Sequence, residues 1–350
     1  MLAACRAQLD VAHWVVAPDS HPLPDGQSVA AGAAALALAA RARDADAELV
    51  VVLSGGASAM LAAPSDGVTL ELKREATRRL LASGATIQEI NAVRKHLSRI
   101  KGGRLALDVS CTTFALSDVT DDDPASIGSG PSVPDPSTRE DAMRVVERTG
   151  LARDLPELTE AIARGEETPK PGDARLARSR FVLIGGRRTA MDGVVTAALL
   201  AEHATIVLDE PITGDASAAG AEFVARAIAA ARRIGGRAVV IASGETTVQV
   251  RGAGTGGRNQ EFAFGAALEI RDASITVAAF GTDGIDGNSS AAGAIADETT
   301  LARAATAGLD PRSALRDNDT STFFGALGDL IVTGPTGTNV GDVFVAMIDA

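Results

Sequence analysis

The sequence predicts an α/β protein with two domains, and three observations support this prediction. First, the chain has 350 residues, more than a single ordinary hydrophobic core usually organises. Second, short apolar runs rich in β-branched residues alternate with alanine-rich runs of helical character. Third, several of the short runs are apolar throughout, as in strands covered on both faces. Helices between such strands favour parallel sheets with right-handed crossovers.

Eight segments are predicted as strands. They are residues 14–17, 48–53, 112–117, 180–185, 204–209, 238–243, 275–280 and 342–348. The apolar run 29–40 is too short to span a bilayer and is predicted to be a helix. The polar, proline-containing segment 165–175 is predicted to be an exposed connection. Glycine-rich loops dominate after Gly235, so the predicted domains are residues 1–235 and 236–350.

Composition restricts the classes of partner. The formal net charge is −12, from 33 lysines and arginines against 45 acids, which argues against nucleic acid and anionic membranes as partners. Two cysteines, Cys5 and Cys111, suggest no disulfide framework, and the histidine and cysteine spacing argues against a zinc site. No signal-peptide pattern opens the chain, so a cytoplasmic location is predicted. A homodimer is compatible with the sequence.

In open α/β sheets, ligands bind beyond the carboxyl ends of the strands, so ligand-binding residues are expected in the loops that follow strands. Strand 48–53 runs into Ser54, Gly55 and Gly56 before a helix, and backbone N–H groups at such a turn can bind an anion. A tight turn that merely needs glycine is the structural alternative. Strand 112–117 leads to Asp118, a candidate Mg²⁺ ligand, whereas the aspartates at 121–123 are interpreted as a solvated loop.

The segment 91–105 is basic and contains no acid. Its cationic or titratable residues are Arg94, Lys95, His96, Arg99, Lys101 and Arg104. In a chain of net charge −12 this local inversion favours anion binding, close to Gly102 and Gly103, which are predicted to end a helix. The alternative is a solvated basic face of that helix.

Three loops rich in glycine and polar residues follow strands in the last part of the chain. They are 244–257, which contains Glu245, Gly256 and Gly257; 281–287, which contains Asp283 and Asp286; and 335–339, which contains Thr338 and Asn339. Together they predict one ligand-binding wall. Arg258 then opens a predicted helix, where a cation is unfavourable by a few tenths of a kcal/mol. An anion is therefore expected beside it.

The sequence supports neither of two common nucleotide-binding motifs. No GxxxxGK[ST] motif occurs, which excludes a P-loop nucleotidase. Gly252, Gly254 and Gly257 fit GxGxxG, but the preceding segment alternates polar and apolar residues like a half-exposed strand. The acid at the required offset, Asp272, precedes the next strand instead of ending it. Dinucleotide binding by this loop is therefore disfavoured.

Taken together, these residues resemble the class II glycerate 2-kinases, which have an N-terminal Rossmann-like α/β domain and a smaller C-terminal MOFRL domain. The matching motifs are SHPLPD (20–25), LSGGASAM (53–60), ASGATIQEINAVRKHLSRIKGGRL (82–105), LSDVTDDDP (116–124), SGPSVPDP (129–136), SGETTVQVRGAGTGGRNQE (243–261), GTDGIDG (281–287) and TGPTGTNVGD (333–342). The resemblance implies phosphate transfer from ATP to the 2-hydroxyl of D-glycerate, with Mg²⁺, in a cleft between the domains. Some members carry the name hydroxypyruvate reductase.

The resemblance also implies roles for individual residues. Arg258 would contact the substrate and the moving phosphoryl group, with Glu245, Asn259 and Glu261 as polar neighbours. Ser54, Gly55 and Gly56 would form the anion loop of the N-terminal domain, and Lys95 and Lys101 its basic segment. We expect Arg258, Asp283 and Glu245 to act in catalysis. Asp118 and Asp286 are the expected Mg²⁺ ligands.

The chain departs from the family pattern at several points. Ala57 replaces a customary third glycine, and Gly341-Asp342 replaces a customary Asn-Asp. Family members begin with a further segment whose Gly-Lys-Ala lysine is thought to be catalytic, and no residue here matches that lysine by motif. A version extended upstream is expected to be more soluble and more active. Two alternatives stay open: an NAD(P)H-dependent hydroxypyruvate reductase and a non-catalytic ligand-binding paralogue.

Overall fold

The computed structural model describes residues 23–235, 237–270 and 274–349. Two compact units are present, Met1–Ile184 (the N unit) and Gly185–Ala350 (the C unit). The predicted strand 14–17 lies outside the described residues. The compact units divide after Ile184, whereas the sequence places the family's domain boundary after Gly235, and that boundary stays a prediction.

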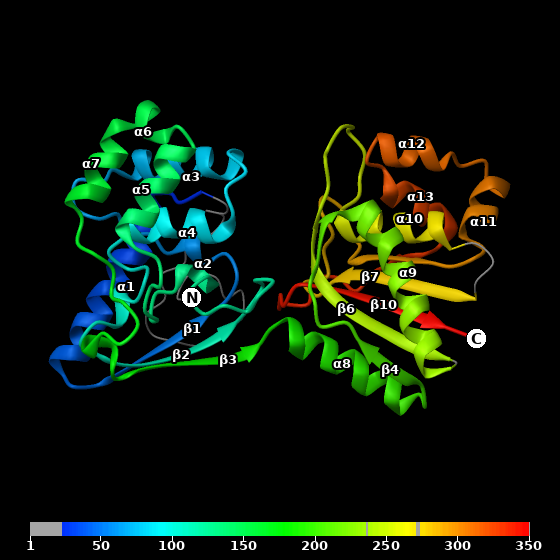
Figure 1. The fold of residues 1–350 in the computed structure, drawn as a ribbon, viewed down its shortest axis with the longest axis horizontal. Helices are drawn as coiled ribbons and strands as arrows, with labels where there is room; N and C mark the ends of the chain where they lie inside the picture. Colours follow the sequence, from blue (N-terminus) through cyan, green and yellow to red (C-terminus); the bar gives the residue numbers. More distant parts are fainter. Residues whose placement is uncertain (1–22, 236, 271–273, 350) are drawn as a thin grey trace. The chain divides into compact units, whose positions relative to one another are not determined.

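The N unit contains a three-stranded sheet in the order β1 (Glu48–Leu53), β2 (Ser110–Leu116), β3 (Ser179–Gly185) (Figure 1). β1 and β2 are parallel, as predicted, with Glu48 opposite Ser110. The predicted helix at 29–40 is confirmed as α1 (Gly26–Asp44), which begins at a capping box formed by Asp25 and Ser28. Alanines on one face of α1 pack close to the sheet, which suits the low aromatic content.

Helices form the rest of the N unit. The short α2 (Ala57–Met60) follows β1, and five further helices pack around their own aliphatic core. These are α3 (Leu70–Ala82), α4 (Ile87–His96), α5 (Arg139–Arg148), α6 (Leu151–Asp154) and α7 (Pro156–Arg164). The sequence predicted a helix that ended at Gly102 and Gly103. That is wrong, because α4 ends at His96 and the following residues form turns.

The C unit contains a seven-stranded sheet in the order β4-β6-β10-β7-β8-β9, with β5 also paired to β6. The strands are β4 (Ala204–Val207), β5 (Ile212–Asp215), β6 (Ala238–Thr247), β7 (Ile275–Gly281), β8 (Gly293–Ala296), β9 (Leu330–Ile331) and β10 (Asp342–Ile348). β4 and β5 are parallel to β6, but β10 runs antiparallel to both β6 and β7. The expectation of purely parallel sheets is therefore wrong here. β7 joins β8 through a loop without a helix, and such a connection suits antiparallel neighbours.

Helices cover both faces of this sheet (Figure 1). α8 (Arg187–Leu200) packs against Val239 and Ile241, whereas α9 (Ala216–Ile234) and α10 (Arg258–Glu269) pack against Val240 and Ala242. Successive side chains of a strand point to opposite faces, so β6 is buried on both sides. The three remaining helices are α11 (Thr300–Thr306), α12 (Pro311–Arg316) and α13 (Thr320–Leu327).

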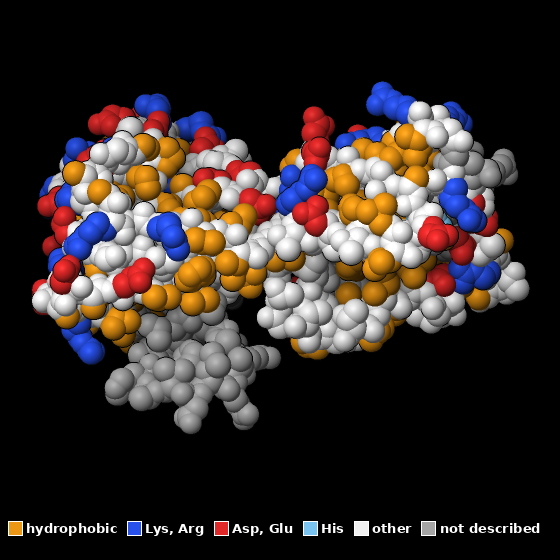
Figure 2. Space-filling view, turned by 90° about the horizontal axis from the view of Figure 1, so that it is seen from below, with side chains coloured by type: hydrophobic (Ala, Val, Ile, Leu, Met, Phe, Trp, Pro, Cys, Tyr) orange, Lys and Arg blue, Asp and Glu red, His pale blue; other side chains and the backbone are white. Residues whose placement is uncertain are grey.

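Hydrophobic side chains gather on the face of the N unit that carries its sheet (Figure 2). The large exposed ones on β1 and β3 are Val50, Val52, Leu183 and Ile184. Within the described part of the chain, no helix is both long enough and apolar enough to cross a lipid bilayer.

Candidate functional site

The C unit has a hollow of about 620 Å³ where the loops after β6 and β7 meet the start of α10. Its charged lining residues are Arg258, Glu261, Asp283, Asp286 and Asp342. Gly256, Gly257 and Thr246 also line it. Two of the three predicted loops thus line the hollow, and the third contacts one of them, because the Thr336 N–H donates to the carbonyl of Asp283 over 3.1 Å. Thr338 and Asn339, from the third, are not among the residues that line the hollow, and Asn339 accepts a hydrogen bond from the Gly341 N–H over 3.0 Å.

Arg258, the first residue of α10, is held by two acids from other strands. Its Nε donates to Asp342 Oδ2 over 2.5 Å and its Nη2 to Asp342 Oδ1 over 3.2 Å. Its Nη1 donates to Glu245 Oε1 over 2.9 Å. Burial alone would lower the pKa of Arg258, but Asp342 and Glu245 more than offset it and raise the pKa. The anion expected beside this helix start is therefore present within the protein itself.

The hollow is acidic. Four carboxylates, Glu261, Asp283, Asp286 and Asp342, share its lining with one arginine. The charge that lines this part of the C unit is therefore negative. A polyphosphate would meet net repulsion here unless a cation came with it.

Asp286, a predicted Mg²⁺ ligand, caps the N-terminus of α10. Its Oδ1 accepts from the Asn259 N–H over 3.0 Å and its Oδ2 from the Gln260 N–H over 2.8 Å. These are helix-start N–H groups, which have no partner inside the helix. Burial raises the pKa of Asp286 to about 6, although these hydrogen bonds oppose the shift. Both carboxylate oxygens are therefore engaged in holding the helix.

Gly257 is explained by this cap. A Cβ on Gly257 would overlap the Asp286 carboxyl group, so only glycine lets the acid reach the helix start. At Gly257 the group that approaches is a carboxylate of the protein.

The remaining polar neighbours of Arg258 are largely buried. Asn259 donates from Nδ2 to Asp286 Oδ1 over 3.3 Å, and its Oδ1 has no hydrogen-bond partner among the described residues. Glu261 Oε1 accepts from Asn318 Nδ2 over 2.8 Å, and burial raises the pKa of Glu261. Asn318 was missed by sequence reasoning, since nothing in its local sequence marks it. Asp342 was noted only as a departure from the family pattern.

In the N unit, an acid from the next strand end lies against the predicted anion loop. Gly56 has a φ of 76° and precedes α2. A Cβ on Gly55 would overlap the carboxylate of Asp118, which follows β2. The structure therefore brings Asp118 against the turn formed by Ser54, Gly55 and Gly56, as neighbouring parallel strands would suggest.

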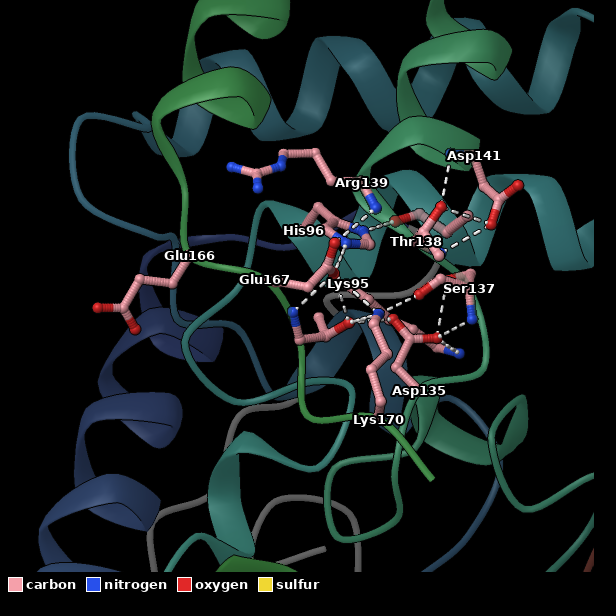
Figure 3. Close-up of polar contacts among 12 residues, drawn as sticks. Lys95, His96, Asp135, Ser137, Thr138, Arg139, Asp141, Glu166, Glu167 and Lys170 are labelled. Carbon is pink, nitrogen blue, oxygen red and sulfur yellow. Dashed lines mark hydrogen bonds and ion pairs between the residues drawn. The ribbon is translucent and has the colours of Figure 1, made fainter. Parts of the chain in front are cut away.

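The two predicted lysines of the basic segment differ. Lys95 Nζ lies 3.0 Å from Asp135 Oδ1, and the two side chains are 5% and 0% exposed (Figure 3). Lys101, which is 1% exposed, donates to the carbonyl of Ser58 over 2.7 Å and to Ser58 Oγ over 3.1 Å. The alternative of a solvated basic face is wrong for both. Lys95 already has a carboxylate partner, whereas Lys101 contacts neutral oxygens.

The donor set does not make a protein-only metal site. Among the described residues there is no group of three or more His, Cys, Asp or Glu that could hold a metal ion. Asp118 belongs to the N unit, and the oxygens of Asp286 are occupied by the cap of α10. Mg²⁺ in phosphoryl-transfer sites commonly uses one or two carboxylates together with substrate phosphates, so a preformed cage is not required.

The protein is of the α/β class. Polar residues gather at the ends of its strands, where α/β enzymes bind their ligands. Comparison with known families is more specific. Residues 4–163 match the family described as "Domain of unknown function (DUF4147)", and residues 238–342 match the MOFRL family.

Relatives cover most of the chain. A D-glycerate 2-kinase from Thermotoga maritima is 37% identical, over 94% of this chain and 78% of its own length. A protein of Agrobacterium vitis, provisionally named a hydroxypyruvate reductase, is 41% identical over 94% of this chain and 76% of its own length. The crystal structure of the glycerate kinase from Thermotoga maritima superposes with a TM-score of 0.83 at 36% identity, over 94% of this chain and 79% of that one. The chain belongs to the two-domain glycerate 2-kinase family.

Proposed function

We propose that this protein transfers the γ-phosphoryl group of ATP to the 2-hydroxyl of D-glycerate, giving 2-phosphoglycerate and ADP. The observation that carries the proposal is the family match, which extends over nearly the whole chain and includes a relative named D-glycerate 2-kinase. The position of Arg258 beside the hollow of the C unit, where its acidic neighbours hold it, also supports this activity.

Arg258 is the residue that we assign to the substrate or the transferring phosphoryl group. Its Nε and Nη2 are fixed by Asp342, which is buried, so the guanidinium plane is held in one orientation. Its Nη1 faces Glu245, whose side chain is 49% exposed. An incoming carboxylate or phosphoryl oxygen can compete with Glu245 for that donor without disturbing the Asp342 pair. Positioning and charge neutralisation are the main demands of phosphoryl transfer.

Mg²⁺ would neutralise phosphate charge that the acidic hollow repels, with Asp283 as its proposed ligand in the C unit. Asp286 is better explained as the cap of α10. In this proposal Asp283 acts as a carboxylate ligand and not as a proton donor. Its carboxylate accepts from the Ile285 N–H over 3.1 Å, which keeps the side chain at the edge of the hollow.

The activity is tested by incubating the full chain with D-glycerate, ATP and Mg²⁺ and following ADP formation. Phosphorus NMR of the products distinguishes 2-phosphoglycerate from 3-phosphoglycerate. We expect the 2-phosphate. ADP formation that does not depend on D-glycerate, or a 3-phosphate product, would contradict the proposal.

The reductase named for the Agrobacterium relative is the second candidate. The strand β6 ends at Thr247 and α10 begins at Arg258, so the glycines at 252, 254 and 257 lie in a long loop. A dinucleotide fingerprint requires a tight strand-turn-helix, which this loop does not form. Oxidation of NADH or NADPH by hydroxypyruvate, at a rate above that of ATP turnover with D-glycerate, would favour the reductase.

A further inference from the structure

Two basic residues of the segment 91–105 in the N unit, Lys95 and His96, have acidic partners within the protein. Lys95 is paired with Asp135, which also accepts from Thr168 Oγ1 over 2.9 Å. His96 lies between the carbonyl of Ala92, 2.7 Å from Nδ1, and Glu167, 2.8 Å from Nε2 (Figure 3). These contacts join α4 to the segment before β3 and leave neither side chain for a ligand.

Two other cations satisfy the C-terminal end of α4. Lys73, from α3, donates to the carbonyl of Leu97 over 3.2 Å. Arg104 donates to the carbonyls of Lys95 over 2.8 Å and Ser98 over 2.7 Å. The last carbonyls of a helix lack partners and carry partial negative charge, so cations stabilise them. Lys73 and Arg104 therefore have structural roles.

Arg94 and Lys101 form no ion pair with an acid of the described residues. For the half-buried Arg94, no hydrogen bond or ion pair is found within the described part of the chain. Lys101 Nζ contacts Ser58 and, over 3.5 Å, the carbonyl of Gly128. Burial lowers the pKa of both side chains, and for Lys101 the neighbouring cations Lys73, Arg94 and Lys95 lower it further. Buried charge without a counter-ion is costly, so a bound anion would be strongly favoured.

A chain of neutral polar groups connects the surroundings of these two cations. Asn91 precedes Arg94 by almost one turn of α4 and therefore shares its side of the helix. Asn91 Oδ1 accepts from Ser129 Oγ over 2.9 Å, and Ser129 Oγ lies 2.7 Å from Ser58 Oγ, which contacts Lys101. Ser58 belongs to α2, directly after the turn that follows β1. The cations thus lie beside a strand-end loop, where α/β proteins bind ligands.

We propose that Arg94 and Lys101 form an oxyanion site in the N unit, which takes the carboxylate or a phosphate group of a small substrate. The site itself follows from two cations that no acid of the described residues neutralises, and only the identity of its ligand rests on the proposed function. Arg94 supplies the planar fork of donors that suits both groups. Lys101 supplies a second, buried donor.

The test uses the full chain and two variants that each remove one positive charge from the same segment. Arg94→Gln is the test variant, and Arg99→Gln is the matched control, because Arg99 is exposed. Binding of inorganic phosphate and of D-glycerate is measured by calorimetry. We expect Arg94→Gln to weaken binding of at least one of them by about tenfold or more, and Arg99→Gln to change neither by more than about twofold. Equal weakening in both variants, or in neither, would overturn the proposal.

Thermal unfolding separates a binding role from a structural one. Without added anion, we expect Arg94→Gln to be at least as stable as the parent, since it removes an uncompensated charge. Phosphate should raise the Tm of the parent and of Arg99→Gln, but not that of Arg94→Gln. A lower Tm for Arg94→Gln, with the phosphate effect preserved, would make Arg94 a structural residue.

Kinetics identify the source of the anion. If the site takes the hydroxy-acid carboxylate, Arg94→Gln raises the KM for D-glycerate and leaves that for ATP unchanged. If it takes a phosphate group, the KM for ATP rises instead. Arg94→Lys should recover part of either loss. Anion binding by a parent chain that has no glycerate-dependent ATP turnover would refute the proposed function but leave the site standing.

Discussion

Arg258 in the C unit and Arg94 in the N unit are arginines in opposite electrostatic surroundings. Arg258 lies among carboxylates, and two of them, Asp342 and Glu245, bind it directly. Arg94 lies among cations, and no acid of the described residues binds it. The acids around Arg258 fix its orientation, whereas the cations around Arg94 leave its charge available. The charge of the neighbouring side chains therefore decides what each arginine can bind, because both arginines carry the same charge themselves.

The largest effect on stability is expected when Lys95, which is paired with Asp135 in the N unit, loses its charge. Lys95→Met leaves the buried Asp135 without its counter-ion, so we expect a loss of about 3–5 kcal/mol in the free energy of unfolding. Urea denaturation measures it. The double variant Lys95→Met/Asp135→Leu should recover much of that loss. If Lys95→Met instead keeps full stability and loses substrate binding, Lys95 belongs with Arg94 and Lys101.

The cap of α10 is expected to make stability depend on pH. The pKa of Asp286 rises from 3.8 in the unfolded chain to about 6 in the folded one. Between these values the folded state keeps a proton that the unfolded state has released, so the contribution is complete below pH 3.8 and is lost as the pH rises through 6. The advantage of the parent over Asp286→Ala should therefore shrink by about 2 kcal/mol from pH 4 to pH 7.

This prediction is checked by urea midpoints of both proteins at several pH values. Asp283→Ala, from the same turn, is the control and should follow the parent. An advantage that is constant with pH would show that Asp286 is charged in the folded state throughout, and would make it available to a cation.

Removing the Arg258 side chain should slow catalysis. We expect Arg258→Ala to lower kcat/KM by about 100-fold or more, because a donor aimed at developing charge is lost. The variant also leaves the buried Asp342 unpaired, so its stability must be measured alongside. Arg258→Lys keeps a charge for Asp342 but not the planar fork, and should remain impaired. A loss below about threefold in a folded variant would assign Arg258 a purely structural role.

The smallest effect is expected at the exposed partner of Arg258. Glu245→Gln keeps the shape of the side chain and removes its charge, so Nη1 becomes easier for a substrate oxygen to reach. We expect a change in KM of less than about tenfold with an unchanged free energy of unfolding, since Glu245 is 49% exposed. A collapse of kcat would show instead that the Glu245 carboxylate acts in the reaction.

Much of the fold could be predicted from local sequence. The predicted strands that fall within the described residues are present as β1, β2, β3, β4, β6, β7 and β10. Long apolar runs identify buried strands because burial on both faces demands them. β5, β8 and β9 were missed, since they are short and lack such runs. The antiparallel placement of β10 was also missed, because strand direction depends on how the chain returns to the sheet.

The sequence by itself determined where the glycine loops, the basic segment 91–105 and Arg258 lie along the chain. Only the tertiary structure decided which charges are compensated. Arg258 finds Asp342 84 residues further along the chain, and Lys95 finds Asp135 40 residues away. The physical reason is that ion pairing depends on distance in space, which local sequence does not encode. The same kind of long-range contact pairs Lys95 and His96 with acids, and leaves Arg94 and Lys101 without an acidic partner among the described residues.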